Sequence, residues 1–456
     1  MKTETAASVT LLLAVAVSLL TPMRHAVLTR VSQIGDTHAT TSRTRIELWR
    51  SGLRMFADHP VTGAGLDAFV AAFPAYRTPE LTRLEWGGTP GKAHNDAIQI
   101  LATQGLLGGL AALAILILTA LALGRVARRG NPAARDTAIV TGASLAAYAV
   151  SSLVGFGTVA VSALAAALAG WASRAAWPVE AGSEPARPAW RLAAGILLAA
   201  VLGYFLVVRP LRAEIYLAEA LHQPSGTPAR GALLDSAARS APWDPRFPAE
   251  VGRTYFAQAL GEQDPSTRLE LLALARRSLE GAIAVAPENG ENRILYGTVL
   301  SGQSIMETGV STPEQVRAEF LKAVALDPWS PMVLVGAERG LIASGLTADA
   351  RALALTCARA YPEYAPPLAD LGTMALEQGR TAAAAETLAL AVTRDWREDQ
   401  GSAAHAWTGL AQALLALGRN EEATAAADSA LARDPRLGQA FAIKQAALRG
   451  MASGKK

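Results

Sequence analysis

The feature that most constrains this chain is the uncharged apolar run Gly105–Gly124. A helix of about 20 apolar residues is long enough to cross the hydrocarbon core of a bilayer. Four other stretches approach this length, and all of them lie before residue 210. They are Ala7–Met23, Thr137–Leu153, Val159–Ala172 and Leu192–Val208. The sequence therefore predicts a multi-pass membrane domain with five helical spans.

The first stretch has a second interpretation, a signal peptide with Lys2 as its basic end. Residues Thr21–Arg24 lack the small-x-small cleavage pattern that this interpretation needs. Both interpretations place the following loop outside the cytoplasm.

The charges of the short loops predict how the spans are oriented, because cytoplasmic loops carry an excess of Lys and Arg. The loop after the second span is densely basic, with Arg125, Arg128, Arg129 and Arg135. The turn Gly155–Gly157 is uncharged, and the linker Ser173–Arg191 is again rich in arginine. Five spans that start in the cytoplasm end outside it. We therefore predict a bacterial inner-membrane protein. It would have a span at 1–23, a periplasmic loop at 24–104, four spans with cytoplasmic linkers at 105–208 and a periplasmic domain at 209–456.

The second half of the chain has the pattern of a helical repeat array. Prolines punctuate it at Asp244-Pro245, Ala286-Pro287, Asp327-Pro328, Tyr361-Pro362 and Asp434-Pro435. Successive spacings are 42, 41, 34 and 73 residues, the last close to two units. A 34-residue unit with occasional insertions is typical of tetratricopeptide repeats, which bind proteins or extended chains. The pairs Gly379-Arg380 and Gly418-Arg419 are predicted to end the first helix of a unit. The expected fold class is all-α, a polytopic helical membrane domain followed by a tetratricopeptide-like α-solenoid. A generic helical bundle is the alternative.

The composition excludes several kinds of site. A net charge of +3 is too small to indicate nucleic-acid binding. The single cysteine, Cys357, excludes an intrachain disulfide and a CxxC metal site, so we predict no metal. On an Ala/Leu-rich helix it is expected to be a small core residue.

The loop at 41–109 is predicted to carry the chemistry. Thr44–Ala57 has helical periodicity, with an apolar face at Ile46, Leu48, Trp49, Leu53 and Phe56 and arginines on the other face. Gly63 and Gly65 permit a tight turn, and a short helix is expected at Leu66–Phe73. Ala93-His94-Asn95-Asp96 then begins the helix that enters the membrane.

These motifs, in this order, resemble the O-antigen ligase family of membrane glycosyltransferases over about residues 40–175. The motifs are Arg45…Trp49, Asp58-His59-Pro60…Gly63…Gly65…Phe69, Ala93-His94-Asn95-Asp96, Gln99 and Gly105-Leu106-Leu107-Gly108. The resemblance implies transfer of a glycan from an undecaprenyl-diphosphate donor to a hydroxyl of a glycan, a lipid A core or a protein. It implies no cofactor.

The resemblance also implies roles for single residues. Arg45 would stabilise the diphosphate leaving group, and His94 would accept the proton of the acceptor hydroxyl. The residues expected to help bind the substrate are Arg43, Arg50, Arg77 and Asn95. A carboxylate pair, Asp58 with Asp96, is the alternative acid/base arrangement, that of a hydrolase.

Two departures from the family keep other functions open. Family members usually have further spans before this loop, and they usually have an acidic residue near position 103, where this chain has Thr103. The chain is therefore expected to be a fragment, a sequence with a misassigned start or half of a split protein. A non-catalytic membrane scaffold for the repeats, and a glycan polymerase of the same superfamily, remain alternatives to the ligase.

Overall fold

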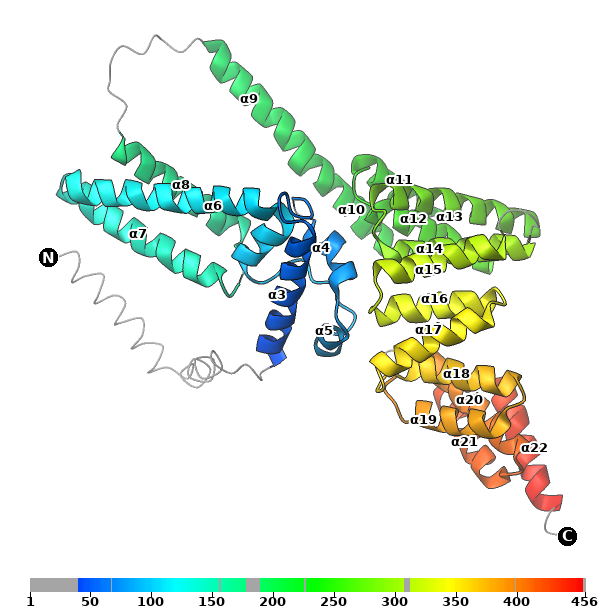
Figure 1. The fold of residues 1–456 in the computed structure, drawn as a ribbon. Coiled ribbons are helices and arrows are strands. Elements are labelled where there is room, and N and C mark those ends of the chain that lie inside the picture. The colour runs from blue at the N-terminus through cyan, green and yellow to red at the C-terminus, as the bar shows by residue number, and fades with distance from the viewer. Residues whose placement is uncertain are drawn as a thin grey trace. The chain divides into compact units, whose positions relative to one another are not determined.

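The computed structural model describes residues 40–453 except 67, 156, 178–188, 225–226, 307–311 and 398. All regular elements in these ranges are helices, which confirms the predicted all-α class. The chain divides into two compact units, Met1–Arg191 and Leu192–Lys456, and each is described by itself (Figure 1). The predicted first span, Ala7–Met23, lies outside the described residues.

The first unit combines a folded loop with three long helices. Its elements are α3 (Thr40–Asp58), α4 (Phe69–Ala72), the 3-10 turn η1 (Phe73–Tyr76), α5 (Pro79–Leu84), α6 (Asp96–Arg129), α7 (Pro132–Ser152) and α8 (Val159–Ala176). Helix α6 packs against both α7 and α8. Small residues allow the close approach, since the shared core there is made of Ala122, Val126, Ala138, Ala172 and Ala176.

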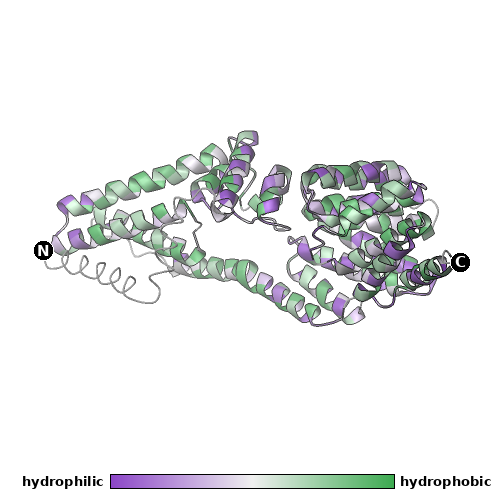
Figure 2. Cartoon of the chain, turned by 90° about the horizontal axis from the view of Figure 1, so that it is seen from below, coloured by the Kyte–Doolittle hydropathy of each residue, from purple (hydrophilic) through white to green (hydrophobic). Residues whose placement is uncertain are grey.

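Three described helices are long and apolar enough to cross a membrane. They are Asp96–Arg129, Val159–Ala176 and Ala193–Leu221. The first two each contain a predicted span, and the third contains all but the first residue of Leu192–Val208. Figure 2 shows mainly hydrophobic residues along the long helices of the first unit, whereas the repeat helices carry both hydrophobic and hydrophilic residues. The predicted span Thr137–Leu153 is almost wholly helical in α7, but α7 is not among these three. A crossing by α7 stays a prediction.

The two ends of α6 differ in chemistry. Arg128 and Arg129 lie in its last turn, and the Arg125 guanidinium carbon lies 5.9 Å from the centre of the Trp177 ring. At its other end, Asn95 contacts the turn that joins α7 to α8. The basic cluster and the Ala93–Asp96 motif are therefore at opposite ends of one helix, the arrangement that the predicted orientation requires.

The loop before α6 has its own core. Its fully buried side chains come from α3, α4, η1, α5, the segment just before α6 and the first part of α6. They are Leu48, Met55, Phe69, Phe73, Leu81, Ala93 and Ala102. Two expectations were wrong in detail. Leu53 is 47% exposed, because the buried stripe of α3 runs through Leu48, Gly52 and Met55 instead. The short helix expected at Leu66–Phe73 is reduced to α4, and η1 follows it.

The second unit begins with one long continuous helix. It consists of α9 (Ala189–Gly203), the π-helical turn η2 (Tyr204–Val208) and α10 (Arg209–Leu221). Twelve further helices follow: α11 (Pro228–Ser240), α12 (Arg246–Gly261), α13 (Pro265–Val285), α14 (Gly290–Met306), α15 (Pro313–Leu326), α16 (Pro331–Ala343), α17 (Thr347–Ala360), α18 (Ala365–Glu377), α19 (Thr381–Ala391), α20 (Gln400–Ala416), α21 (Asn420–Arg433) and α22 (Gly438–Ser453).

Consecutive helices from α10 onward pack in pairs, which confirms the tetratricopeptide-like array. All five predicted turn prolines lie between helices. Gly379 and Gly418 follow α18 and α20 with φ of 71° and 74°, the left-handed conformation that ends a helix. Ala384 and Ala423 are fully buried, as expected where two helices cross closely.

Candidate functional site

The site is built around a break in α6. Gly105 has φ 63° and ψ −158°, so the helix consists of a short first part and a long apolar second part. A break leaves amide groups without their usual acceptors four residues earlier. The loop at 60–65 crosses the break and supplies partners. The hydrogen bonds run from Leu106 N to Pro60 O (2.8 Å), Leu107 N to Val61 O (3.2 Å), Ala64 N to Ala102 O (2.9 Å) and Gly65 N to Thr103 O (2.9 Å).

Two motif glycines make this backbone crossing possible. A Cβ on Gly63 would lie 2.2 Å from the Gln104 nitrogen, and a Cβ on Gly105 would lie 2.4 Å from the Val61 carbonyl. Both glycines also have positive φ, which side chains disfavour. The motif His-Pro-x-x-Gly-x-Gly and the later motif Gly-Leu-Leu-Gly therefore contact each other at this crossing.

The Ala93–Asp96 motif fixes the start of α6. The Asn95 side chain caps the helix by accepting from Ile98 N at 3.1 Å, and its amide donates to Leu153 O at 2.8 Å. The Asp96 carboxylate accepts from Gly157 N at 3.0 Å. Asn95, expected to bind substrate, thus joins α6 to the turn between α7 and α8.

His94 is held just before this cap. It is half-buried and has φ 53°, an uncommon conformation for a residue with a side chain. On one side, Ala93 is fully buried and its N–H donates to the Gln99 side chain at 2.8 Å. On the other side, Asn95 is tied by its cap. Strained backbone of this kind is common at functional sites, and here the contacts of Ala93 and Asn95 hold the backbone on both sides of His94.

Helix α3 crosses the start of α6 at Gly52. A Cβ on Gly52 would lie 2.7 Å from Ile98 Cγ2 and 3.9 Å from Ala93 Cβ, so the two helices touch beside His94. Arg45 is seven residues before Gly52, and residues seven apart lie on the same flank of a helix, about 10 Å apart along its axis. The flank of α3 that carries Arg45 therefore leads to the neighbourhood of His94.

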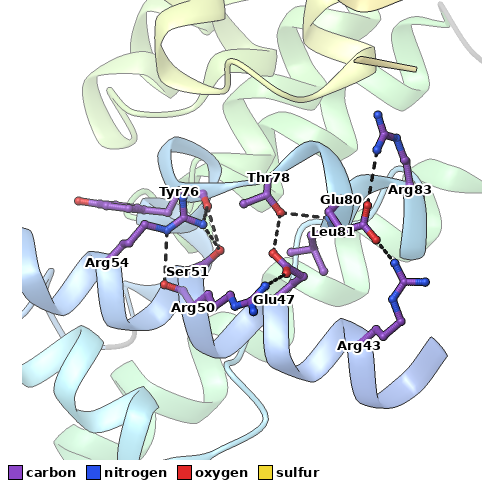
Figure 3. A network of polar contacts seen from close by, with 10 residues as sticks. All are labelled: Arg43, Glu47, Arg50, Ser51, Arg54, Tyr76, Thr78, Glu80, Leu81 and Arg83. Carbon is purple, nitrogen blue, oxygen red and sulfur yellow. Dashed lines mark hydrogen bonds and ion pairs between the residues drawn. The ribbon is translucent and has the colours of Figure 1, made fainter. Parts of the chain in front are cut away.

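The other predicted arginines have partners (Figure 3). Arg43 pairs with Glu80, and Arg50 Nη1 lies 2.6 Å from Glu47 Oε1. Glu47 also accepts from the Thr78 hydroxyl at 3.2 Å. This network joins α3 to the start of α5.

Arg77 has a different environment. It is 5% exposed, and it donates to Gly88 O at 2.7 Å and to Thr89 Oγ1 at 2.9 Å. Its guanidinium also lies over the Phe73 ring, 5.6 Å from the centre. Arg77 therefore holds the Gly-rich segment that precedes His94.

Arg45 differs from these three arginines. It is exposed, and it forms no hydrogen bond or ion pair with the described part of the chain. An arginine without an internal partner keeps its planar donors available for an anionic ligand. Of the four arginines predicted for the site, three thus have partners, and Arg45 has none among the described residues.

The two carboxylates of the alternative acid/base pair, Asp58 and Asp96, each bind a different partner. Asp58 accepts from the Tyr76 hydroxyl at 2.9 Å, which contributes to raising the pKa of Tyr76 to about 12 after the larger effect of burial. Asp96 binds the Gly157 amide. Over the described ranges, no group of three His, Cys, Asp or Glu side chains could hold a metal ion.

Sequence reasoning missed two residues that shape the site, Glu47 and Gly52, and it gave the motif residue Gln99 no role. A glycine within a helical pattern is a signal of close packing, and Gly52 had that signal. Glu47 is 8% exposed, and its position three residues before Arg50 indicated the ion pair. Gln99 belonged to the quoted motif. Its side chain accepts a hydrogen bond from the Ala93 amide only because the chain folds back before α6, which the sequence pattern does not reveal.

These features define a class: a helical membrane protein with a folded loop packed on the broken start of a membrane helix, followed by a repeat array. The family model described as O-antigen ligase matches residues 4–113, so this part of the chain is an O-antigen ligase domain. The match begins before the region of the expected resemblance and ends within α6. Helices α7 and α8 lie beyond it.

Among solved structures, the chain is similar to "Crystal structure of APC/C hetero-tetramer Cut9-Hcn1", with 14% identity and a TM-score of 0.37 over 90% of this chain and 76% of that one. It is also similar to "Crystal Structure of the Yeast Tom70", with 11% identity and a TM-score of 0.26 over 91% of this chain and 96% of that one. Both scores are low, so the repeat assignment rests on the helix pairs themselves. No curated protein matches the chain.

Proposed function

We propose that this protein is a glycosyltransferase of the O-antigen ligase type that moves a glycan from undecaprenyl diphosphate to an acceptor hydroxyl in the periplasm. The ligase domain supports the general reaction class. The observation that supports the proposal is the crossing of α3 and α6 at Gly52, which lies on the same flank of α3 as Arg45 and packs against Ile98 and Ala93, close to His94 in the chain.

The proposed reaction is a displacement at the anomeric carbon of the donor sugar. The acceptor oxygen forms a bond to this carbon while the bond from the carbon to the diphosphate oxygen breaks. His94 takes the proton of the acceptor hydroxyl, and the leaving diphosphate keeps the bonding electron pair. Arg45 stabilises the charge that develops on the diphosphate, because a guanidinium presents several donors and a permanent charge.

The remaining predicted residues have supporting roles in this proposal. Arg43 and Arg50 add positive charge along α3, although each is paired with a carboxylate. Arg77 holds the segment before His94, and Asn95 holds the start of α6. The basic end of α6 supports a periplasmic location for the opposite end, where His94 lies.

Two variants test the catalytic roles directly. In a host that depends on this protein for surface-glycan attachment, we expect His94→Ala and Arg45→Ala to abolish attachment at normal protein levels in the membrane. Arg45→Lys should restore only part of it, because lysine lacks the planar fork. Arg54→Ala is the control for loss of an arginine on α3, since Arg54 is exposed on the other flank and its hydrogen bonds to Ser51 Oγ and Tyr76 O are long, at 3.4 Å. Normal attachment with His94→Ala would contradict the proposal.

A scaffold is the second candidate function, and the size of the array favours it. The repeats extend from Arg209 to Ser453, and such arrays offer surfaces for other proteins. A scaffold predicts that His94→Ala keeps full function while truncation before α11 abolishes it. The ligase predicts loss in both cases.

A further inference from the structure

The last apolar run of the chain ends abruptly at a charge. Leu192–Val208 has no charged residue, and Arg209 follows it directly. At about 1.5 Å per helical residue this run spans about 25 Å, close to the hydrocarbon thickness of a bilayer. If the run crosses the membrane, Arg209 lies at the level of the lipid headgroups.

Arg209 connects the end of the apolar run to the first helix pair of the repeats. Its guanidinium carbon lies 5.5 Å from the centre of the Phe205 ring, one turn earlier, and 4.9 Å from the Trp243 ring. It also donates to the last carbonyls of α11, from Nε to Ser240 O at 2.9 Å and from Nη2 to Arg239 O at 3.1 Å. The turn after α11 is therefore held against the end of the span.

The aromatic side chains at this junction are half exposed. Tyr204, Phe205 and Trp243, which we call the aromatic collar, are 47%, 45% and 48% exposed. Aromatic rings of this kind gather at the membrane–water interface, where the ring meets both apolar and polar surroundings. The other end of the run has the same chemistry, because Trp190 is 65% exposed and the Arg191 guanidinium lies 5.6 Å from its ring centre.

Two further cations flank the collar. Arg212 is exposed one turn after the span, and Arg239 is exposed in the last turn of α11. Basic side chains beside a bilayer attract anionic headgroups by about 1 kcal/mol each. Trp243 comes from the repeats but shares a guanidinium with Phe205 of the span, so it lies close to the same depth.

We propose that the first helix pair of the array, α10 with α11, rests on the lipid surface through the aromatic collar, with Arg212 and Arg239 contacting anionic headgroups. The partner of this surface is the bilayer itself. The first repeat is then a membrane-seated base and not the end of a free tether. This inference depends on the α9 span and is independent of the proposed transfer reaction.

A depth measurement tests the proposal. The full chain, with its only cysteine removed by Cys357→Ala, receives a nitroxide at Pro242→Cys, next to Trp243. It is reconstituted in nanodiscs of phosphatidylethanolamine and phosphatidylglycerol. We expect the label to collide severalfold more with oxygen than with a water-soluble nickel chelate. A label at Ile305→Cys, on α14 and 73% exposed, is the aqueous control.

The measurement is made in the nanodiscs and repeated in native membranes. Nickel access at position 242 equal to that at 305 would overturn the proposal, as would protection seen only in native membranes, which would indicate a protein partner. Adding Trp243→Ala should raise nickel access at 242 severalfold, and an unchanged value would remove Trp243 from the contact. Omitting phosphatidylglycerol should also raise it, and no change would refute the role of the two arginines.

Discussion

Glu338 on α16 gives the sharpest prediction for the array. Its side chain is fully buried, and neither carboxylate oxygen has a hydrogen-bond partner in the described part of the chain. Burial raises the pKa of Glu338 to about 9; the nearby Asp370 adds to this increase and Arg339 opposes it. The perturbation is Glu338→Gln, which keeps the shape and removes the ionisable group.

The magnitude follows from the pKa difference. The ordinary pKa is 4.5, so between pH 4.5 and about 9 the folded state holds a proton that the unfolded state releases. The free energy of unfolding then falls by about 1.4 kcal/mol per pH unit as the pH rises through this window. At pH 7 the loss is about 3 kcal/mol. Glu338→Gln should recover most of this loss and show no such slope.

The chain provides its own probe of this region. Cys357 is the only cysteine, it is fully buried on the neighbouring α17, and its charge is coupled to Glu338. We propose to measure its labelling by 4,4′-dithiodipyridine in the full chain, which reports local opening. At pH 7 the wild type should label about 100-fold faster than Glu338→Gln, since 1.4 kcal/mol is a factor of ten.

The comparison at several pH values makes the test strict. The reagent reaches Cys357 only in the opened state, where the thiol is in solvent and away from Glu338 in both proteins, so the pH dependence of thiol reactivity cancels in the ratio of their rates. This ratio should rise about tenfold per pH unit from pH 5 to pH 8. A ratio that does not change with pH would refute the assignment of a neutral, buried Glu338.

Glycine substitutions give the remaining predictions. Gly105→Ala should abolish glycan attachment and lower the level of folded protein in detergent, because its Cβ would meet backbone, whereas Gly87→Ala, with positive φ but open space, should cost only about 1–3 kcal/mol of strain. Equal effects in size-exclusion profiles would contradict the backbone crossing. In the array, Gly372→Ala should lower the melting temperature, since its Cβ would lie 2.6 Å from Leu388, whereas Gly281→Ala, open and within α13, should stabilise by up to about 1 kcal/mol. A lower melting temperature for Gly281→Ala would argue against the packing described.

Periodic features could be predicted from the sequence because they depend on local patterns. The apolar runs, the turn prolines and the glycines after α18 and α20 each determine structure within a few residues. The two flanks of α3 also follow from spacing, since Arg43 and Arg50 are seven residues apart, as are Arg45 and Gly52.

The features that could not be predicted depend on contacts distant in sequence. Gly105 looks like one of several glycines in an apolar helix, and its break appears only when the loop at 60–65 is placed against it. Asn95 and Arg77 are polar loop residues that were expected to bind substrate, yet their hydrogen bonds go to Leu153 and Gly88. The sequence predicted a set of site residues, but it did not predict which of them hydrogen-bond within the described part of the loop.

The backbone crossing at Gly105 also has a consequence for biosynthesis. The loop at 60–65 is synthesised before the helix whose Leu106 and Leu107 amides it satisfies. Those amides stand at the edge of a hydrophobic span, where an unpaired N–H costs several kcal/mol. The loop at 60–65 therefore remains without these contacts until α6 has inserted into the membrane. The hydrogen bonds between the loop and α6 form only after that insertion. A variant that weakens these hydrogen bonds should therefore be degraded by membrane proteases during assembly.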